Sequence, residues 1–113
     1  MHELSLCQSI MELVVESAKR ERMTRIARVV VEIGVAAAVD ADALRFCFPI
    51  VAEDTLAAGA ELAIVGVPLR ARCNSCGAEF APETPFDPCP ACGGVERVIL
   101  SGREMRVVSF EGA

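Results

Sequence analysis

Two short stretches, Cys73-Asn74-Ser75-Cys76-Gly77 and Cys89-Pro90-Ala91-Cys92-Gly93, decide how the second half of this chain folds. Each is a Cys-x-x-Cys pair followed by glycine, and twelve residues separate the two pairs. The glycine can take the positive φ that turns backbone N–H groups toward sulfur. Four thiolates at this spacing suit one tetrahedral Zn(II) and leave no open position for a substrate. The sequence therefore predicts a structural zinc site formed by Cys73, Cys76, Cys89 and Cys92.

Two disulfides or a redox-active dithiol are the competing interpretations of these cysteines. Metal ligation needs reduced thiols, which suits the cytoplasm, whereas six oxidised cysteines would require export. The beginning of the chain contains Glu3 and Glu12 and has no basic leader before a long apolar run. We therefore expect a cytoplasmic protein. Cys7 and Cys47 lie among apolar neighbours at helical spacing, and we expect them to be small core residues.

Length and composition limit the classes of partner. With 113 residues, 53% of them hydrophobic and none Trp or Tyr, the chain can form one modest aliphatic core and a metal-held appendage. No stretch approaches the roughly 20 apolar residues of a membrane span, so no membrane partner is expected. The formal charge is −5; four bound thiolates contribute −4 and Zn(II) +2, which takes it to −7. An acidic chain without a basic stripe argues against nucleic-acid binding.

Helical periodicity occurs in two places. From residue 4 to about residue 22, apolar residues recur every three or four positions, which predicts an amphipathic helix. A second helix is predicted after residue 40, capped by Asp40 or Asp42. We expect Pro49 to kink this helix or to lie near a break, because proline removes a helical hydrogen bond and crowds the preceding turn.

Three strands are predicted, at 25–34, 61–69 and 103–110. The first strand would carry an apolar face made of Ala27, Val29, Val31 and Ile33. The second strand leads directly to Cys73, and the third follows the last cysteine pair. The cysteine module is thus expected to be inserted between strands of the main sheet.

The predicted fold class is α+β, with two helices packed on a three-stranded sheet and an inserted zinc-ribbon-like module of two CxxC knuckles. The predicted domains are 1–69 plus 101–113, which form an α+β domain, and 70–100, which form the zinc-binding domain. The four prolines of the intervening loop keep it irregular, so the metal would supply the order that so small a module lacks.

The amino terminus offers a second kind of metal chemistry. His2 directly follows Met1, so the terminal amine, the deprotonated amide nitrogen of His2 and its imidazole Nδ1 can form fused chelate rings. Planar nitrogen donors suit Ni(II) or Cu(II), and Glu3 or Asp40 could supply a further donor. From the residues alone, a terminal histidine is more often an accident, Glu3 a first-turn acid and Asp40 a cap. No catalytic motif accompanies it, because His2 is the one histidine and no phosphate loop, GxSxG or HExxH occurs.

Several motifs, in order along essentially the whole chain, closely resemble the HypA/HybF family. They are Met1-His2-Glu3-Leu4-Ser5-Leu6, Val31-Glu32-Ile33-Gly34, the turn Thr55-Leu56-Ala57-Ala58-Gly59-Ala60-Glu61-Leu62, both CxxC knuckles, and Gly102-Arg103-Glu104-Met105-Arg106-Val107. Two features depart from the family pattern: Pro49, which falls where members usually keep an uninterrupted helix, and the bland loop Ala36 to Ala38.

The resemblance implies a nickel metallochaperone rather than an enzyme, which delivers Ni(II) for maturation of [NiFe]-hydrogenase and in some organisms of urease. It implies nickel ligands at Met1, through its amine, and His2, with Glu3 and Asp40 as additional candidates, and zinc ligands at the four cysteines. It also implies a HypB-like GTPase partner, the hydrogenase large subunit or its maturation complex, and a scaffold capable of homodimerisation. The alternative is a zinc-ribbon protein-interaction adaptor that does not deliver nickel.

Overall fold

The computed structural model describes residues 3–113, so the predicted nickel ligands Met1 and His2 lie outside the described residues. The chain forms two compact units. The helical unit comprises the residues up to 32 together with 38–65 and 106–113, and the cysteine unit comprises 33–37 and 66–105. The domain limits predicted from the sequence stay predictions.

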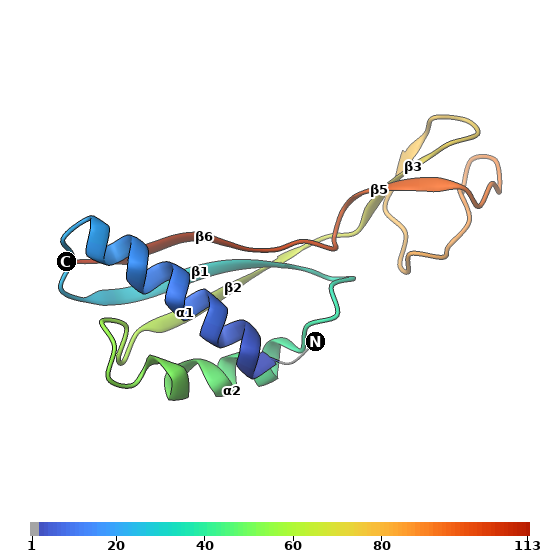
Figure 1. The fold of residues 1–113 in the computed structure, drawn as a ribbon. Helices are drawn as coiled ribbons and strands as arrows, with labels where there is room; N and C mark the ends of the chain where they lie inside the picture. The colour runs from blue at the N-terminus through green and yellow to red at the C-terminus, as the bar shows by residue number, and fades with distance from the viewer. Residues whose placement is uncertain (1–2) are drawn as a thin grey trace. The chain divides into compact units, whose positions relative to one another are not determined.

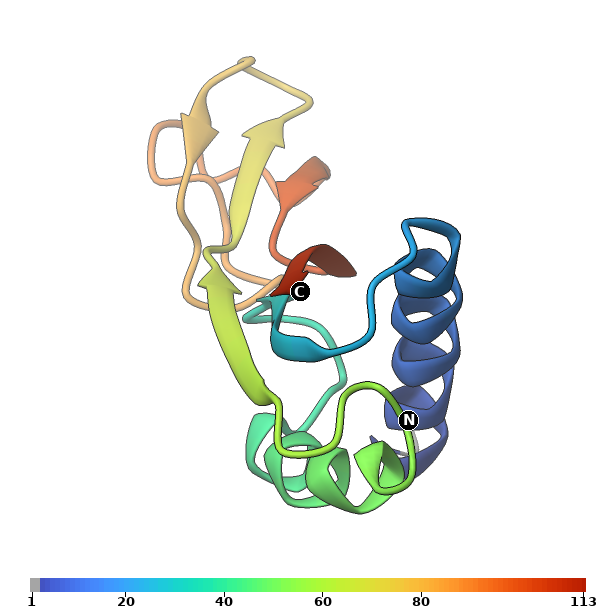
Figure 2. The same cartoon turned by 90° about the vertical axis from the view of Figure 1, so that its left-hand side faces the viewer.

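The helical unit contains two helices and a mixed three-stranded sheet of order β2-β1-β6 (Figures 1 and 2). Its elements are α1 (Glu3–Arg20), β1 (Ile26–Gly34), α2 (Ala41–Ala52), β2 (Glu61–Val67) and β6 (Met105–Gly112). Ile26 N–H bonds the Leu56 carbonyl (2.8 Å), and further along the chain Val35 N–H bonds the Val67 carbonyl (3.0 Å). The residue numbers of both partners thus increase in the same direction. β1 and β2 are therefore parallel, connected through α2, as a βαβ unit requires.

β6 runs antiparallel to β1, because Ala113 N–H bonds the Arg25 carbonyl (2.9 Å) at one end and Gly34 N–H bonds the Glu104 carbonyl (2.8 Å) at the other. The last strand of the chain therefore returns beside the first and forms one edge of the sheet. The predicted strand at 103–110 is confirmed with a shift of two residues, to 105–112. Neither of the two helices found in residues 3–113 has the length and apolarity needed to cross a membrane.

The core of the helical unit lies between the helices and one face of the sheet. The buried apolar residues are Cys7, Ile10, Met11, Val14 and Ala18 on α1, Leu44, Phe48 and Ala52 on α2, and Ile26, Val29 and Val31 on β1. Val29 and Val31 are fully buried at alternate positions, so they share the face that the helices cover. The predicted face was wrong at Ala27, which is exposed, while Ile26 is fully buried in its place.

The second helix continues through its proline and does not break there. Asp40 is the N-cap, and the helix runs through Pro49 to Ala52. The missing hydrogen bond would have joined residue 49 to the carbonyl of Arg45, and both residues are exposed, so water can satisfy that carbonyl. Buried Phe48 and Ala52 anchor the last turn on either side of the proline.

The cysteine unit contains a small antiparallel sheet of order β4-β3-β5. Its strands are β3 (Arg70–Cys73), β4 (Glu79–Phe80) and β5 (Arg97–Ser101), of which the sequence predicted none as a separate element. Arg72 lies between Glu79 of β4 and Val98 of β5, and Ala71 lies between Phe80 and Ile99. β5 is consequently an edge strand of this sheet.

Candidate metal centre

The two Cys-x-x-Cys stretches fold into knuckles with the same backbone hydrogen bonds. In the first, Gly77 N–H bonds the Cys73 carbonyl at 2.9 Å, and in the second, Gly93 N–H bonds the Cys89 carbonyl at 2.7 Å. Gly77 and Gly93 have φ values of 76° and 75°, as the sequence predicted. Other residues are strained at such φ angles, so each glycine allows the chain to fold back beneath its cysteine pair.

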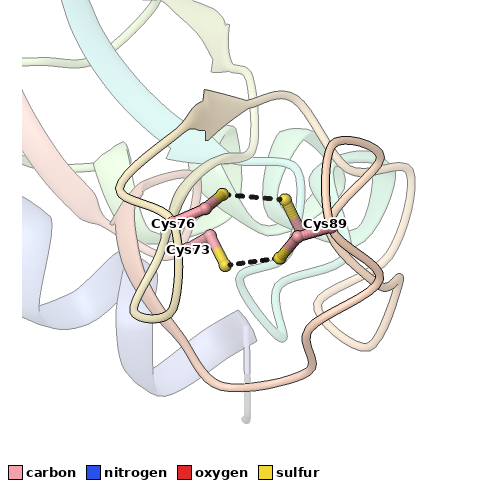
Figure 3. Close-up of side chains that lie close together, drawn as sticks. Cys73, Cys76 and Cys89 are labelled. Atoms are coloured by element: carbon pink, nitrogen blue, oxygen red, sulfur yellow. Dashed lines mark hydrogen bonds between the residues drawn. The ribbon is translucent and has the colours of Figure 1, made fainter.

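The knuckles bring four sulfur atoms together (Figure 3). The Sγ atoms of Cys73 and Cys92 lie 3.5 Å apart, those of Cys76 and Cys89 lie 3.7 Å apart, and all four lie within 4.8 Å of one another. Zn–S bonds of about 2.3 Å at tetrahedral angles would place the sulfur atoms about 3.8 Å apart. The four cysteines are thus positioned for one tetrahedral ion, and residues 3–113 contain no other such group of His, Cys, Asp and Glu side chains.

The thiols of the cluster influence one another's pKa values. N–H groups of Cys76 and Ser75 point at the Cys73 sulfur and lower the pKa of that thiol to about 6. At Cys92, the Gly94 N–H lowers the pKa, but its thiol contacts, first with Cys73 and then with Cys76, outweigh that effect and raise the pKa to about 12. A first thiolate therefore opposes the formation of others, and a bound divalent cation removes this repulsion.

Burial of the sulfur ligands is uneven. Cys73 and Cys89, the first cysteine of each knuckle, are 2% exposed, whereas Cys76 and Cys92 are exposed. A side chain at Gly94 would put its Cβ 3.2 Å from the Cys92 sulfur and 3.4 Å from the Cys73 sulfur. The glycine therefore keeps the space beside the sulfur atoms open.

A hydrogen-bonded turn supports the loop between the knuckles. The Asp87 carboxylate accepts bonds from the Glu83 N–H (2.8 Å) and the Thr84 hydroxyl (2.8 Å). The Thr84 hydroxyl, followed by the N–H groups of Thr84 and Glu83, lowers the pKa of Asp87. Arg97 of β5 donates to the Asp87 carbonyl. These contacts fix the loop that the prolines keep irregular, and no motif in the sequence indicated them.

Two predicted nickel candidates, Glu3 and Asp40, lie close together in the helical unit. Glu3 is the first residue of α1, and its Oε2 accepts a hydrogen bond from the backbone N–H of Asp40 at 3.2 Å. The contact joins residues 37 positions apart and brings the start of α2 to the start of α1. Asp40 is exposed and Glu3 is half-buried, so water reaches both carboxylates.

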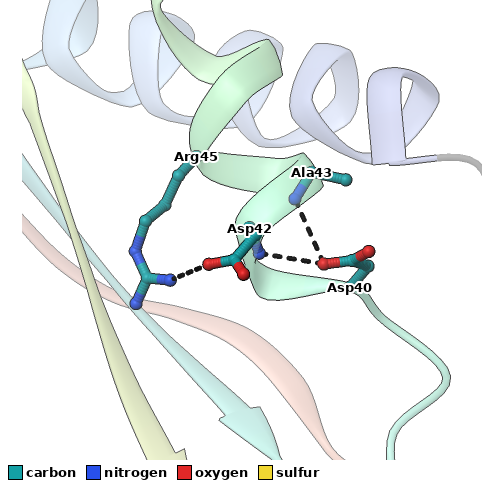
Figure 4. A network of polar contacts seen from close by, with 4 residues as sticks. All are labelled: Asp40, Asp42, Ala43 and Arg45. Atoms are coloured by element: carbon teal, nitrogen blue, oxygen red, sulfur yellow. Dashed lines mark hydrogen bonds and ion pairs between the residues drawn. The ribbon is translucent and has the colours of Figure 1, made fainter.

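The Asp40 side chain already has a structural role (Figure 4). Its Oδ1 accepts hydrogen bonds from Asp42 N–H (3.0 Å) and Ala43 N–H (3.2 Å), the arrangement of a helix N-cap. Of the two predicted caps, Asp40 is thus the correct one, and Asp42 instead pairs with Arg45 at 3.1 Å. A single carboxylate oxygen, Oδ2, is left for a metal.

The remaining two cysteines lie in the helical unit, away from the sulfur cluster in sequence. Cys7 is fully buried and donates its thiol proton to the Leu44 carbonyl at 3.4 Å, as expected of a core residue. Burial, followed by the neighbouring Cys47 and Glu3, raises the pKa of Cys7 to about 11. Cys47 is only half-buried. The Cys7 thiol is therefore neutral and unreactive at physiological pH.

Comparisons with known proteins agree over the full length of the chain. The family model described as "Hydrogenase/urease nickel incorporation, metallochaperone, hypA" matches residues 1–112. The hydrogenase maturation factor HypA of Geobacter metallireducens is 45% identical over 111 residues, which are 98% of each chain. The solution structure of the Ni metallochaperone HypA from Helicobacter pylori is similar with a TM-score of 0.70 at 32% identity, covering 99% of this chain and 97% of that one. A second solution structure of a HypA protein gives a TM-score of 0.76 at 33% identity, covering 100% and 97%.

Proposed function

We infer the function from one premise, that the chain belongs to the HypA family of hydrogenase and urease nickel-incorporation metallochaperones. We propose that it binds Ni(II) at its amino terminus and delivers it for maturation of [NiFe]-hydrogenase. The family consists of maturation factors rather than enzymes, so nickel is a cargo and not a catalytic cofactor. The observation that carries the proposal is that the family match begins at residue 1 and thus includes the terminal Met-His-Glu. In some organisms the client could equally be urease.

The proposed donors are the Met1 amine, the backbone nitrogen and imidazole of His2, and Glu3. The start of α1 at Glu3 supports this set, because the first N–H groups of a helix have no carbonyl partner within it. An amide nitrogen at this point can lose its proton to nickel without breaking a helical hydrogen bond. Asp40 is the proposed additional donor, through Oδ2, since its backbone N–H already contacts the Glu3 carboxylate.

Such a site would be shallow, which suits a carrier. Nickel would leave by exchange of one ligand at a time, and protonation of the amine and imidazole would weaken binding at acidic pH. We propose a HypB-like GTPase and the hydrogenase large subunit, or its maturation complex, as partners in this exchange. The proposed location is the cytoplasm, and a homodimer is the proposed assembly.

At the sulfur cluster we propose structural Zn(II), held by Cys73, Cys76, Cys89 and Cys92. The separations between the sulfur atoms fit a tetrahedral ion of this size. When bound, the ion would supply the folding free energy that the small β4-β3-β5 sheet cannot obtain from burial alone. It would perform no step of nickel transfer.

The decisive experiment compares the protein with its natural beginning and a variant with four glycines added before Met1. The added residues move the terminal amine out of chelating reach of the His2 imidazole, so the nickel dissociation constant should rise at least about tenfold in isothermal titration. His2→Ala should also abolish the d–d absorption band of planar Ni(II). Zinc content and circular dichroism serve as controls and should not change. Equal nickel affinity in the extended protein would refute ligation by the terminal amine and leave the zinc-ribbon adaptor as the better hypothesis.

A further inference from the structure

Two of the four cysteines in the sulfur cluster are accessible to solvent. Cys76 and Cys92, the second cysteine of each knuckle, are exposed, whereas Cys73 and Cys89 are only 2% exposed. Gly94 adds to this access, because a Cβ at that position would lie 3.2 Å from the Cys92 sulfur and 3.4 Å from the Cys73 sulfur. Oxidants can therefore reach the cluster, since exposed thiolates are the cysteines most readily oxidised.

Each accessible cysteine contacts a buried cysteine of the other knuckle (Figure 3). The Cys92 sulfur lies 3.5 Å from that of Cys73, and the Cys76 sulfur lies 3.7 Å from that of Cys89. A disulfide bond is about 2.05 Å long, so each couple has to close by about 1.5 Å to form one. An accessible thiolate beside a second, protected one is the usual arrangement of redox-sensing cysteines.

We propose that hydrogen peroxide converts the cluster into two disulfides, Cys73–Cys92 and Cys76–Cys89, which join the two knuckles in place of the metal ion. This redox response rests on the proposed zinc site and adds a way of emptying it. Disulfides that form in the cytoplasm are usually transient and redox-sensing, because the thiol pool reduces them again. The cysteine unit thus releases its ion under oxidising conditions and recovers it under reducing ones.

One molecule of peroxide oxidises each couple. The accessible thiolate, Cys92 or Cys76, attacks a peroxide oxygen; an S–O bond forms, the O–O bond breaks and one hydroxide leaves. The buried thiolate, Cys73 or Cys89, then attacks the resulting sulfenic sulfur; the S–S bond forms, the S–O bond breaks and a second hydroxide leaves. Each couple thus loses two electrons, which reduce the peroxide to two hydroxide ions. The four ligands lose their negative charges, and with them their affinity for a divalent ion.

The pairing of the cysteines determines whether the knuckles stay together once the ion has left. Disulfides within each Cys-x-x-Cys pair would leave the knuckles unconnected. Bonds between the knuckles instead tie Cys73, at the end of β3, to the knuckle that precedes β5, and Cys73 already pairs with Arg97 of β5. The pairing of β3 with β5 therefore persists in the oxidised form, so reduction restores the metal site without refolding the unit.

The test follows zinc release and disulfide pairing in one sample. The zinc-loaded protein receives about two equivalents of hydrogen peroxide per chain, a chromogenic chelator reports free zinc, and mass spectrometry identifies the products. Cleavage after Glu83 separates the knuckles unless a disulfide joins them, and fragmentation between the two cysteines of each knuckle assigns the partners. Zinc should appear as the four thiols disappear, with Cys73 linked to Cys92 and Cys76 to Cys89. A dithiol reductant with added zinc should then restore the parent protein.

Substitution of Gly94 tests the access of peroxide without removing a ligand. Gly94→Ala puts a methyl group beside the Cys73–Cys92 couple, 3.4 Å from the first sulfur and 3.2 Å from the second. Zinc release should slow at least about threefold, because oxidation of thiolates follows their exposure. Gly66→Ala is the matched control, since a Cβ there would meet no atom within 4 Å and neither glycine has the positive φ that disfavours alanine. The control should release zinc at the rate of the parent.

Several results would overturn the redox response. Disulfides within each Cys-x-x-Cys pair, or sulfinic acids without disulfides, contradict the proposed couples. Zinc that stays bound to intact thiols in a large excess of peroxide, or equal rates of release from Gly94→Ala and Gly66→Ala, overturns it as well. Zinc content before oxidation and nickel titration report separately on the proposed function. A protein that holds both metals and resists peroxide therefore refutes this response alone, whereas a reduced protein without zinc refutes the zinc site and the response together.

Discussion

Replacing Asp40 separates the two roles that its carboxylate is expected to combine. Oδ1 accepts bonds from the N–H groups of Asp42 and Ala43, and Oδ2 is the oxygen left for nickel. Asparagine caps a helix about as well as aspartate, whereas alanine cannot cap it at all. Asp40→Asn should therefore keep the structural role and lose the charge, while Asp40→Ala should lose both.

The expected magnitudes follow from these contacts. Loss of the cap in Asp40→Ala should lower the free energy of unfolding by about 1 kcal/mol, which corresponds to a fall of about 4 °C in Tm for a chain of this size. Asp40→Asn should change stability by at most about 0.5 kcal/mol. Removal of the carboxylate charge at the proposed donor Asp40 should weaken nickel binding at least about tenfold in both variants, because loss of even an outer partner of a metal's ligands typically costs about that much.

The assay is thermal denaturation of the zinc-loaded protein together with isothermal titration of each variant with Ni(II). Asp42→Asn is the matched control, because Asp42 is an exposed acid in the first turn of the same helix and pairs with Arg45 on its surface. It should leave nickel affinity within about twofold. If Asp40→Asn binds nickel as tightly as the parent, Asp40 is a cap alone and its assignment as a donor is refuted.

Two further predictions concern the cysteines. Cys76→Ser should lower zinc stoichiometry and loosen the cysteine unit, because metal binding and folding of such modules are coupled. The backbone amides of β3 and β5 should then exchange with solvent at least about tenfold faster. A full complement of zinc with unchanged amide protection would contradict the ligand assignment. For Cys7, whose pKa rises from 9.0 to about 11 on folding, the unfolded chain loses its proton first, so the free energy of unfolding should be constant below about pH 8 and fall between pH 9 and 11. Cys7→Ala should remove that part of the pH dependence in denaturant titrations, and identical pH profiles in both proteins would disprove the buried-thiol explanation.

Local patterns predicted the elements whose residues determine their own conformation. The spacing of apolar residues predicted α1 and β1, and the glycine after each cysteine pair predicted the positive φ of Gly77 and Gly93. In each case the signal lies within a few consecutive residues. The spacing of the two Cys-x-x-Cys pairs also predicted that their four sulfur atoms share one centre, because this spacing is typical of a four-thiolate metal site.

Contacts between distant residues were beyond such patterns. Nothing in the spacing of Glu3 and Asp40 indicates that the Asp40 N–H donates to the Glu3 carboxylate across 37 positions. Ala27 was wrongly assigned to the buried face for a related reason. Strict alternation of buried and exposed residues along β1 does not predict that Ile26 is buried and Ala27 exposed. The two-residue strand β4 is too short for any periodicity and is defined only by its pairing with β3.

The two proposed metal sites would require opposite properties, and the chain offers different chemistry at each. The sulfur cluster has four ligands, two of them 2% exposed, so release of its ion would require several Zn–S bonds and a knuckle to open together. At the proposed nickel site, Asp40 is exposed, Glu3 is half-buried, and each lies at the start of a helix. A ligand there can be exchanged for water or for a partner's donor while the helices stay folded. A cargo ion must be released to its client, and we therefore propose the carboxylate pair at the helix starts, rather than the thiolate cage, as the place from which nickel would be transferred.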